Sequence, residues 1–360
     1  MSFGTLRLGT SAFCREGVTV GKHVMVYCEP GRYGGWPANH GIWSWGNEIL
    51  VGFTAGYYKY QGLRRHAIDY ERPQRDLLAR SIDGGETWAV EEPQGDGFPG
   101  LRGAARECLG NIDFTHADFA LRVHMLDKDI GPSFFHYSYD RGKTWQGPFR
   151  LPDFGTPGIA ARTDYLVNSK HDCLLFLTAA KSDRKEGRPF CARTTDGGKT
   201  WTFVSWIGPE PKGFAIMPAS VRLSKSDVLV LARCREGRRN WLSAYLSRDN
   251  WETWEHLNDP VADLGYGGTP PALIELRDRR PCLTYGVRSK PFRICAKLSS
   301  DGARTWGEEI VLRDDGVSFD IGYTRNVQRP DGKVVTVYYF NDAKTGPERY
   351  IAATIWDPVK

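Results

Sequence analysis

Short runs of apolar or alternating residues recur along the chain and predict β-strands. Examples are DLLAR at 76–80, SFFHY at 133–137, LSAYL at 242–246 and ICAKL at 294–298. Each run leads into a segment rich in Gly, Asp, Ser and Thr, and a second short strand follows after a Trp. Two strands joined by such a turn form a hairpin, so the pattern predicts many small antiparallel sheets.

The turns between these strands share one motif, S/T-x-D-x-x-x-T-W, and successive copies begin 52 to 57 residues apart. In such a turn the Asp accepts hydrogen bonds from backbone N–H groups, and Gly supplies positive φ. The Trp closes the turn by packing its ring against the strands. We expect these turns, called Asp boxes below, to be structural. They are SIDGGETW from Ser81, SYDRGKTW from Ser138, TTDGGKTW from Thr194, SRDNWETW from Ser247 and SSDGARTW from Ser299.

The regular spacing of the boxes predicts an all-β, six-bladed β-propeller with four-stranded antiparallel blades. Units of this size cannot bury themselves alone, so they pack as blades around a ring. The segment from 317 to 360 contains RNVQRP, KVVTVYYF and RYIAATIW but no box. It is interpreted as the sixth blade, closed by the N-terminal strand near KHVMVYC. Residues 1–360 are then one propeller domain, with seven blades only if the N-terminal segment forms more than one strand.

Composition agrees with short strands and tight turns, because 12% of residues are aromatic and the chain contains 40 Gly and 21 Pro. No apolar run reaches the ~18 residues of a membrane-spanning helix. A net charge of +5 without a Lys/Arg block argues against nucleic acid and suits an anionic small molecule. Eight cysteines without CxxC spacing indicate buried free thiols. The start lacks the apolar segment of a signal peptide, so a cytoplasmic protein is expected, or a secreted or periplasmic one whose leader was removed.

Boxes at this spacing, ahead of a C-terminal tyrosine segment, resemble the sialidase superfamily over nearly the whole chain. The resemblance implies a six-bladed propeller with an active site at the centre of the ring, on the face opposite the boxes. Sialidases hold the substrate carboxylate with three arginines, and a guanidinium binds a carboxylate through two hydrogen bonds. They also use an Asp as acid/base and a Tyr nucleophile, which, being neutral, is not repelled by an anionic sugar.

The resemblance implies several site residues. Tyr323, in DIGYTRNVQRPDGK, takes the place of the nucleophile. Arg293 precedes the fifth box and Arg239, or its neighbour Arg238, precedes the fourth, as two of the triad arginines do. Asp69 lies where the superfamily places its acid/base.

The sequence departs from strict sialidases at two positions. Gly35 stands where the first arginine is expected, so Arg32 is the substitute if its loop turns inward. Met217 and Pro218 stand where the Glu that activates the tyrosine would fall. Further substrate-binding candidates come from segments that precede or form likely inner strands: Arg162, Arg325 and Trp36.

His40, in WPANHGIWSWG, is a second catalytic candidate because this segment is expected to line the central channel. An imidazole there would act as general acid or base near neutral pH. His116, Asp118 and His124 match no standard ligand spacing, so neither a metal nor another cofactor is expected.

Three functions follow from these residues. The first is an exo-acting, sialidase-like glycoside hydrolase on a glycan containing sialic or uronic acid. The second is a polysaccharide lyase or an α-L-rhamnosidase-type hydrolase of the same fold that uses His40. The third is a non-catalytic glycan-binding propeller. The partner in each case is a glycan, and oligomeric state is left open.

Overall fold

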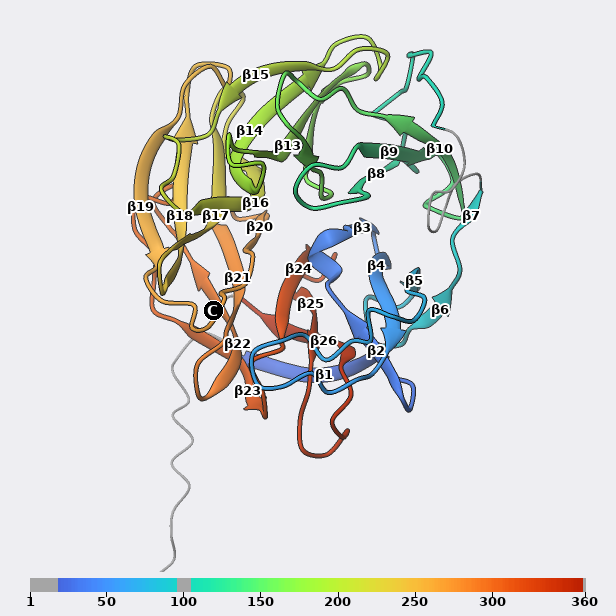
Figure 1. Ribbon diagram of the computed structural model, residues 1–360, viewed down its shortest axis with the longest axis vertical. Helices are drawn as coiled ribbons and strands as arrows, with labels where there is room; N and C mark the ends of the chain where they lie inside the picture. The colour runs from blue at the N-terminus through green and yellow to red at the C-terminus, as the bar shows by residue number, and fades with distance from the viewer. Residues whose placement is uncertain (1–18, 96–104, 359–360) are drawn as a thin grey trace, which may run out of the picture.

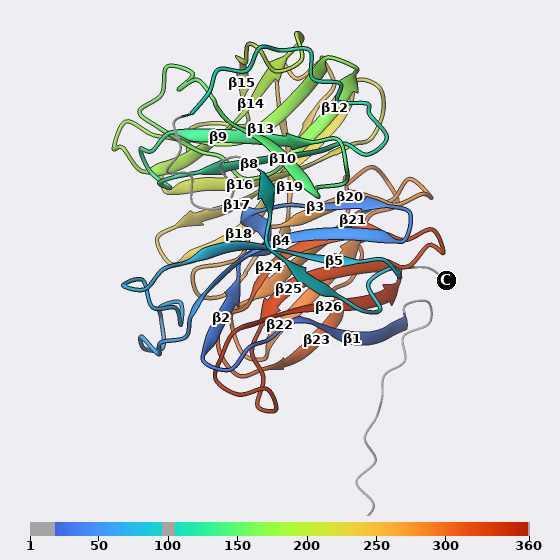
Figure 2. The ribbon, with the colours of Figure 1, turned by 90° about the vertical axis from the view of Figure 1, so that its right-hand side faces the viewer.

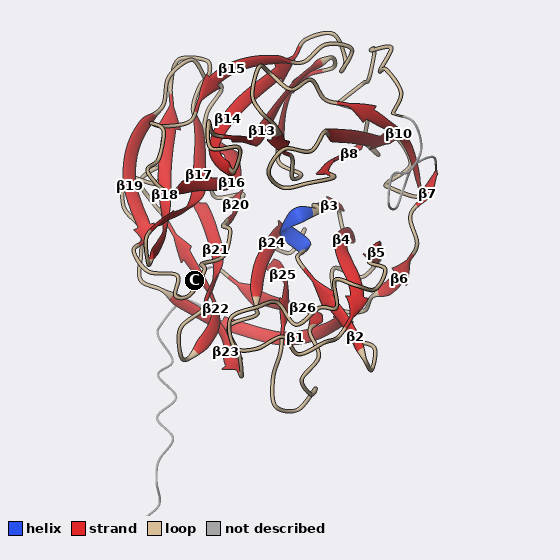
Figure 3. Ribbon diagram, in the orientation of Figure 1, coloured by secondary structure: helices blue, strands red, loops and turns tan. Residues whose placement is uncertain are grey.

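In the computed structural model, which describes residues 19–95 and 105–358, the strands form six small sheets arranged in a ring (Figure 1). A single turn of 3-10 helix, η1 (Pro37–Asn39), lies inside the ring (Figure 3). The expectation about a leader concerns residues 1–18, which lie outside the described part of the chain. Among the described residues, no helix is long and apolar enough to span a membrane.

The first three blades follow one another along the chain. Blade 1 contains β2 (Arg32–Gly35), β3 (Ile42–Trp45), β4 (Glu48–Tyr57), β5 (Arg75–Ser81) and β6 (Ala89–Glu91). Blade 2 contains β7 (Gln94–Gly95), β8 (Ala120–Met125), β9 (Ser133–Ser138) and β10 (Thr144–Arg150). Blade 3 contains β11 (Ile159–Ala160), β12 (Tyr165–Ser169), β13 (Asp172–Ala180), β14 (Glu186–Thr194) and β15 (Thr202–Trp206).

The last three blades have four strands each. Blade 4 contains β16 (Phe214–Arg222), β17 (Val228–Glu236), β18 (Arg239–Ser247) and β19 (Glu255–Val261). Blade 5 contains β20 (Ala272–Glu275), β21 (Pro281–Val287), β22 (Phe292–Leu298) and β23 (Ile310–Gly316). Blade 6 contains β24 (Gly322–Gln328), β25 (Val334–Phe340), β26 (Tyr350–Asp357) and β1 (Thr19–Tyr27).

The predicted six-bladed ring and its closure are confirmed. Strand β1 pairs antiparallel with β26, so the N-terminal strand completes the blade that the C-terminal segment begins. The prediction of four antiparallel strands in every blade holds only approximately, because blades 1 and 3 have five strands. In blade 2, β7 pairs parallel with β10, which no hairpin signal predicts.

The five box turns join the last two strands along the chain in each of blades 1 to 5, with nearly the same set of hydrogen bonds. In the first, the Ser81 hydroxyl donates to the Asp83 carboxylate at 2.8 Å and accepts the Gly85 N–H at 2.7 Å. Asp83 also accepts from the N–H and hydroxyl of Thr87 at 2.9 and 2.6 Å. The Trp88 indole donates to the Gly85 carbonyl at 3.0 Å. The other four turns repeat the contacts of the carboxylate and of the Ser or Thr hydroxyl.

The box carboxylates should make the protein sensitive to acid. Burial raises the pKa of Asp83, but hydrogen bonds from Thr87 and Ser81 outweigh it and lower the pKa to about 2. A carboxyl whose folded pKa is depressed contributes stability above its unfolded pKa, near 3.9, and loses it as pH falls through the folded pKa. We therefore expect the free energy of unfolding to fall between about pH 4 and pH 2 in urea titrations. The D83N variant should show a shallower fall, and an identical slope in both proteins would contradict this explanation.

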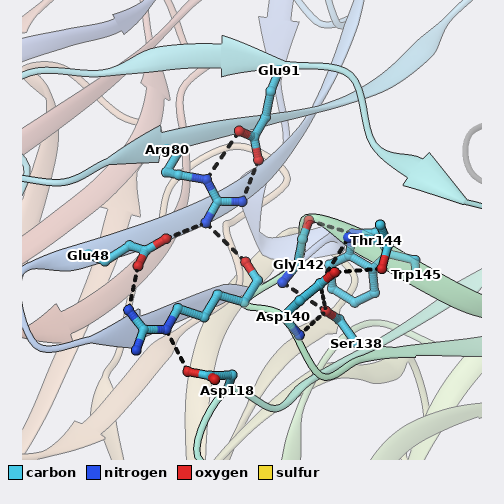
Figure 4. A network of polar contacts seen from close by, with 10 residues as sticks. Glu48, Arg80, Glu91, Asp118, Ser138, Asp140, Gly142, Thr144 and Trp145 are labelled. Carbon is cyan, nitrogen blue, oxygen red and sulfur yellow. Dashed lines mark hydrogen bonds and ion pairs between the residues drawn. The ribbon is translucent and has the colours of Figure 1, made fainter.

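Blades 1 and 2 are joined on the box side by a network of charged side chains (Figure 4). Glu48 accepts from Arg80 at 2.7 Å through one oxygen and from Arg141 at 2.8 Å through the other. Arg80 also pairs with Glu91 in its own blade, and Arg141 pairs with Asp118 at 2.6 Å. Glu48 is the carboxylate that bonds both arginines, one from each blade.

Replacing Glu48 with alanine should lower the free energy of unfolding by about 2 kcal/mol, because two charge-assisted hydrogen bonds are lost at a site that is only 16% exposed. E91A is the matched control. Its carboxylate contacts Arg80 within one blade and is 34% exposed, so its removal should cost less. Urea unfolding at pH 7 measures both variants. An equal or larger loss for E91A would contradict the proposed role of Glu48 between blades.

Candidate active site

A cleft of about 430 Å³ opens at the centre of the ring. Each box turn joins the last two strands of its blade at one end, whereas the cleft is lined from the opposite ends of the strands. Its walls come from the loop after β4, from β17, from the loop before β20, from the residue after β21 and from the residues before β24. The loop after β4 projects from one side of the ring (Figure 2). The cleft therefore lies on the face opposite the boxes, as the sequence resemblance predicts.

Two arginines from neighbouring blades, Arg288, which is buried, and Arg233, which is partly buried, form one basic wall of the cleft. Arg288 is 4% exposed, and its Nε and Nη2 atoms donate to the Ile321 carbonyl at 3.1 and 3.0 Å. Nη2 also donates to the Tyr339 hydroxyl at 2.6 Å. None of the hydrogen bonds found among the described residues uses Nη1 of Arg288. Arg233, on β17, donates to the Gly267 carbonyl and, at 3.4 Å, to the Tyr323 hydroxyl. Both guanidinium groups are thus held in place at the cleft.

Tyr323 lies behind Arg233 and is 9% exposed. Its φ of 54° is left-handed, and a register shift between β24 and β25 interrupts their pairing there. Met217, also at φ 54°, sits at a similar shift between β16 and β17. Strained backbone at non-glycine residues is concentrated at functional sites. Arg233 reaches both residues, since its Nη1 is 3.9 Å from the Met217 sulfur. The hydroxyl of Tyr323 therefore lies beside Arg233. The same arginine contacts Met217, the residue at the position where the resemblance led us to expect a Glu.

A histidine–carboxylate pair forms another wall of the cleft. His66, in the loop after β4, lies with its Nδ1 atom 2.5 Å from the carboxylate of Asp320. Asp320 is fully buried and also accepts from the Ala67 N–H at 2.8 Å, the Tyr339 hydroxyl at 2.8 Å and Arg349 at 3.1 Å. Burial raises the pKa of Asp320, but His66, Arg349 and Arg288 outweigh it, so the pKa is far below its usual range. Asp320 is therefore ionised at any physiological pH.

Aromatic rings complete the cleft. Tyr266 and Phe319 meet edge to face with their centroids 5.4 Å apart, and Arg64 lies over the Tyr266 ring at 5.2 Å. Trp36 packs edge-on against His66 at 5.2 Å, which places this predicted residue behind the histidine. Flat apolar rings beside charged donors are the usual surroundings of a polar ligand with apolar faces.

His40 lies within the inner wall of the ring and is 4% exposed. Its Nε2 is 2.8 Å from the Thr54 hydroxyl and its Nδ1 is 3.2 Å from Arg122. Burial lowers the pKa of His40 to about 4; Asp76 raises it and Arg122 lowers it. His40 is therefore neutral near pH 7, and both ring nitrogens already have partners in the protein.

Arg162 and Arg325 reach the channel but are engaged there. Arg162 forms an ion pair with Glu186 and donates to the Asn39 side chain at 3.1 Å. Arg325 donates to the carbonyls of Ala38 and Thr163, both at 2.6 Å. Their charges hold η1 and the inner strands together around the channel.

The other predicted residues do not line the cleft. The Arg239 side chain is 56% exposed and pairs with Asp259 at 3.0 Å. Arg293 pairs at 2.9 Å with Glu309, between the third and fourth strands of blade 5. The remaining three have local partners too: Arg32 stacks on the Tyr57 ring, Asp69 pairs with Lys59 at 3.2 Å, and the exposed Arg238 accepts at its carbonyl from Asn240. The structure therefore brings Tyr323 together with arginines other than those expected.

Sequence reasoning missed Arg233, Arg288 and Asp320. One signal was available, because Arg233 and Arg288 both stand near the end of the second strand of their repeats. Two of the arginines named from sequence, Arg293 and Arg239, came instead from the segments just before the boxes. Within the described residues, no group of three or more His, Cys, Asp or Glu is placed to hold a metal ion.

Comparison with known proteins agrees with this fold. A protein of unknown function from Dyadobacter fermentans is similar, with 21% identity, a TM-score of 0.72 and coverage of 96% of this chain and 100% of that one. The NanB sialidase from Streptococcus pneumoniae has 12% identity and a TM-score of 0.61, over 92% of this chain and 70% of the sialidase. An α-L-arabinanase from Penicillium chrysogenum has 13% identity and a TM-score of 0.61, over 94% and 99%.

Comparison of the sequence with curated proteins finds no match. The family model for the BNR repeat-like domain matches residues 125–336, which is more than half of the chain. This match places the chain in the BNR repeat-like family, and the six-bladed ring is the fold that it shares with the sialidase and the arabinanase.

Proposed function

We propose that the protein is an exo-acting glycoside hydrolase that removes a terminal anionic sugar, a sialic or uronic acid, from a glycan. The observation that carries this proposal is that Arg288 and Arg233 line one cleft and that both lie beside Tyr323, whose hydroxyl is 3.4 Å from Arg233. A sialidase and an arabinanase share the fold, and both are enzymes that act on glycans.

The arginines favour a carboxylate ligand. Arg288 is fixed by three hydrogen bonds through Nε and Nη2, which leaves Nη1 to bond an incoming anion. A buried guanidinium held in this way binds a carboxylate without losing side-chain entropy, and the charge-assisted bond is strong in a site shielded from water. The cleft volume of about 430 Å³ suits a small ligand, which favours the end of a glycan over an internal stretch.

Tyr323 is the residue proposed to face the anomeric carbon and to attack it or stabilise its positive charge. A tyrosine approaches an anionic sugar without the repulsion that a carboxylate nucleophile would experience. Arg233 donates to the tyrosine oxygen at 3.4 Å, so its charge would stabilise negative charge that develops on that oxygen. Tyr266 and Phe319 offer ring faces and edges to the apolar side of a sugar ring.

The proposal is tested by incubating the protein with sialosides and with uronate-containing oligosaccharides, followed by mass spectrometry of the products. Hydrolysis adds one water to the summed products and releases a free acidic monosaccharide. Products without added water that absorb in the ultraviolet would identify a lyase and contradict the proposal. Binding without any cleavage would identify a glycan-binding propeller and contradict it as well.

A further inference from the structure

We propose that His66, held by Asp320, is the general acid and base that transfers the proton to and from the glycosidic oxygen and the attacking water. The inference rests on the proposed hydrolase function and adds the residue that moves the proton. The resemblance assigns this role to Asp69. That carboxylate instead pairs with Lys59 at 3.2 Å and caps the Glu71 N–H at 3.2 Å.

The contact with Asp320 fixes which ring nitrogen of His66 carries the exchangeable proton. An ionised carboxylate only accepts hydrogen bonds, so Nδ1 of His66 must be the donor in the 2.5 Å contact. The proton on Nδ1 is thereby retained, and Nε2 is the nitrogen that gains and loses a proton. Among the described hydrogen bonds none uses Nε2, and His66 lines the cleft.

The pair is built rigidly on two separate blades. Asp320 precedes β24 of blade 6, and His66 comes from the loop of blade 1, so ring closure brings them together. Asp320 also accepts the backbone N–H of Ala67, the residue next to the histidine, at 2.8 Å. One carboxylate thus holds both the ring and the backbone of this loop, which sets the imidazole in one orientation over the cleft.

Charged and titratable groups surround the His66–Asp320 pair on both blade 6 and the blade 1 loop. Arg349 and Tyr339 contact Asp320 from blade 6, and Arg288 lies close enough to lower its pKa. Burial raises the pKa of Tyr70, on the same loop as His66, to about 12, so its phenol stays neutral. Arg64 and Arg65 also belong to this loop and line the cleft.

The proton transfers balance over the two halves of the reaction. The imidazolium gives its Nε2 proton to the glycosidic oxygen as the bond from that oxygen to the anomeric carbon breaks, which leaves positive charge on that carbon beside the Tyr323 oxygen. The bonding electron pair stays on the leaving oxygen, which departs as a hydroxyl group. Water then attacks the anomeric carbon and gives its proton to Nε2, which restores the imidazolium.

The test compares wild type, H66A and a matched control, H256A, in the full-length protein. His256 also contacts a carboxylate, Asp259 at 3.1 Å, but lies on an exposed strand of blade 4. Each protein receives two glycosides of one acidic sugar, a sialic or uronic acid. One is linked to a sugar alcohol, which leaves only with a proton, and one is linked to 4-nitrophenol, which leaves without help.

H66A should lose about 10²- to 10⁴-fold in kcat/KM on the alcohol-linked substrate and less than about tenfold on the nitrophenyl glycoside, with H256A equal to wild type on both. In the plot of kcat/KM against pH, H66A should also lack the fall at high pH that reflects loss of the proton from the general acid. Equal losses on the two substrates, or no loss on the alcohol-linked one, would overturn the inference while leaving the hydrolase function intact. A wild type that cleaves neither substrate overturns the proposed function and this inference with it.

Nitrogen-15 NMR of the imidazole provides a readout that needs no turnover. The His66 ring, identified by its absence in H66A, should show the Nδ1–H tautomer when neutral. The Nε2–H tautomer would overturn the inference whatever the activity data show.

Discussion

Replacing Asp320 with alanine should lower the free energy of unfolding by about 4 kcal/mol, the largest loss we expect from any single side chain described here. Asp320 is fully buried and accepts hydrogen bonds from His66, Tyr339, Arg349 and the Ala67 backbone. Removing it leaves Arg349, which is 8% exposed, without its buried counter-charge. Breaking a buried ion pair by removing one partner costs about 3–5 kcal/mol, because the other charge is left uncompensated.

Urea unfolding at pH 7 measures this loss, with D263A as the control. Asp263 accepts a single backbone N–H, from Gly265 at 2.8 Å, in an exposed turn, so its removal should cost less than about 1 kcal/mol. D320N keeps the shape but not the charge and should fall between the two. A D320A protein as stable as D263A would show that the pair does not hold the blade 1 loop to blade 6.

Replacing Arg288 with methionine should reduce kcat/KM on the acidic glycan by about 10²- to 10³-fold. The change removes the buried cation whose Nη1 is placed for the substrate carboxylate, and it leaves the sugar's charge facing an apolar side chain. R248M is the control, because Arg248 pairs with Glu255 at 2.6 Å on the exposed surface of blade 4.

Circular dichroism and thermal unfolding accompany the kinetics, since Arg288 also bonds the Ile321 carbonyl and Tyr339. A folded R288M protein with unchanged kcat/KM would remove this arginine from the substrate site. A loss confined to KM would indicate that it binds ground state and transition state equally.

The ring could be predicted from sequence because its signals are local and repeated. Each box encodes its own turn through a Ser or Thr, an Asp and a Trp within eight residues, and the constant spacing counts the blades. The N-terminal strand near KHVMVYC was assigned to the last blade, whose segment from 317 to 360 contains no box. The parallel pairing of β7 with β10 has no local signal and was not predicted.

The site was less predictable because its residues meet through ring closure. His66 and Asp320 are 254 residues apart and touch only when blade 6 closes against blade 1. Arg293 and Arg239 were expected in the site because they precede boxes. On third strands, however, such side chains meet the fourth strand, as the pairs with Glu309 and Asp259 show. Arg233 and Arg288 stand on or just after second strands, whose ends reach the cleft.

His40 shows a related limit. The pattern WPANHGIWSWG correctly indicated a segment beside the central channel, because η1 lies inside the ring. It could not show that Thr54 and Arg122, from β4 and β8, would occupy both ring nitrogens. The burial of His40 depends on side chains from neighbouring strands, and the sequence of its own segment carries no information about them.

Selection of a terminal sugar's carboxylate by Arg288 and Arg233 can be measured with two forms of one substrate. One form carries the carboxylate, and in the other it is reduced to the alcohol. If the arginines bind the carboxylate, wild type should cleave the acid with a kcat/KM about 10²- to 10³-fold above that of the alcohol, and R288M should lose most of this preference. Equal cleavage of acid and alcohol by the wild-type protein would contradict this role of the arginines.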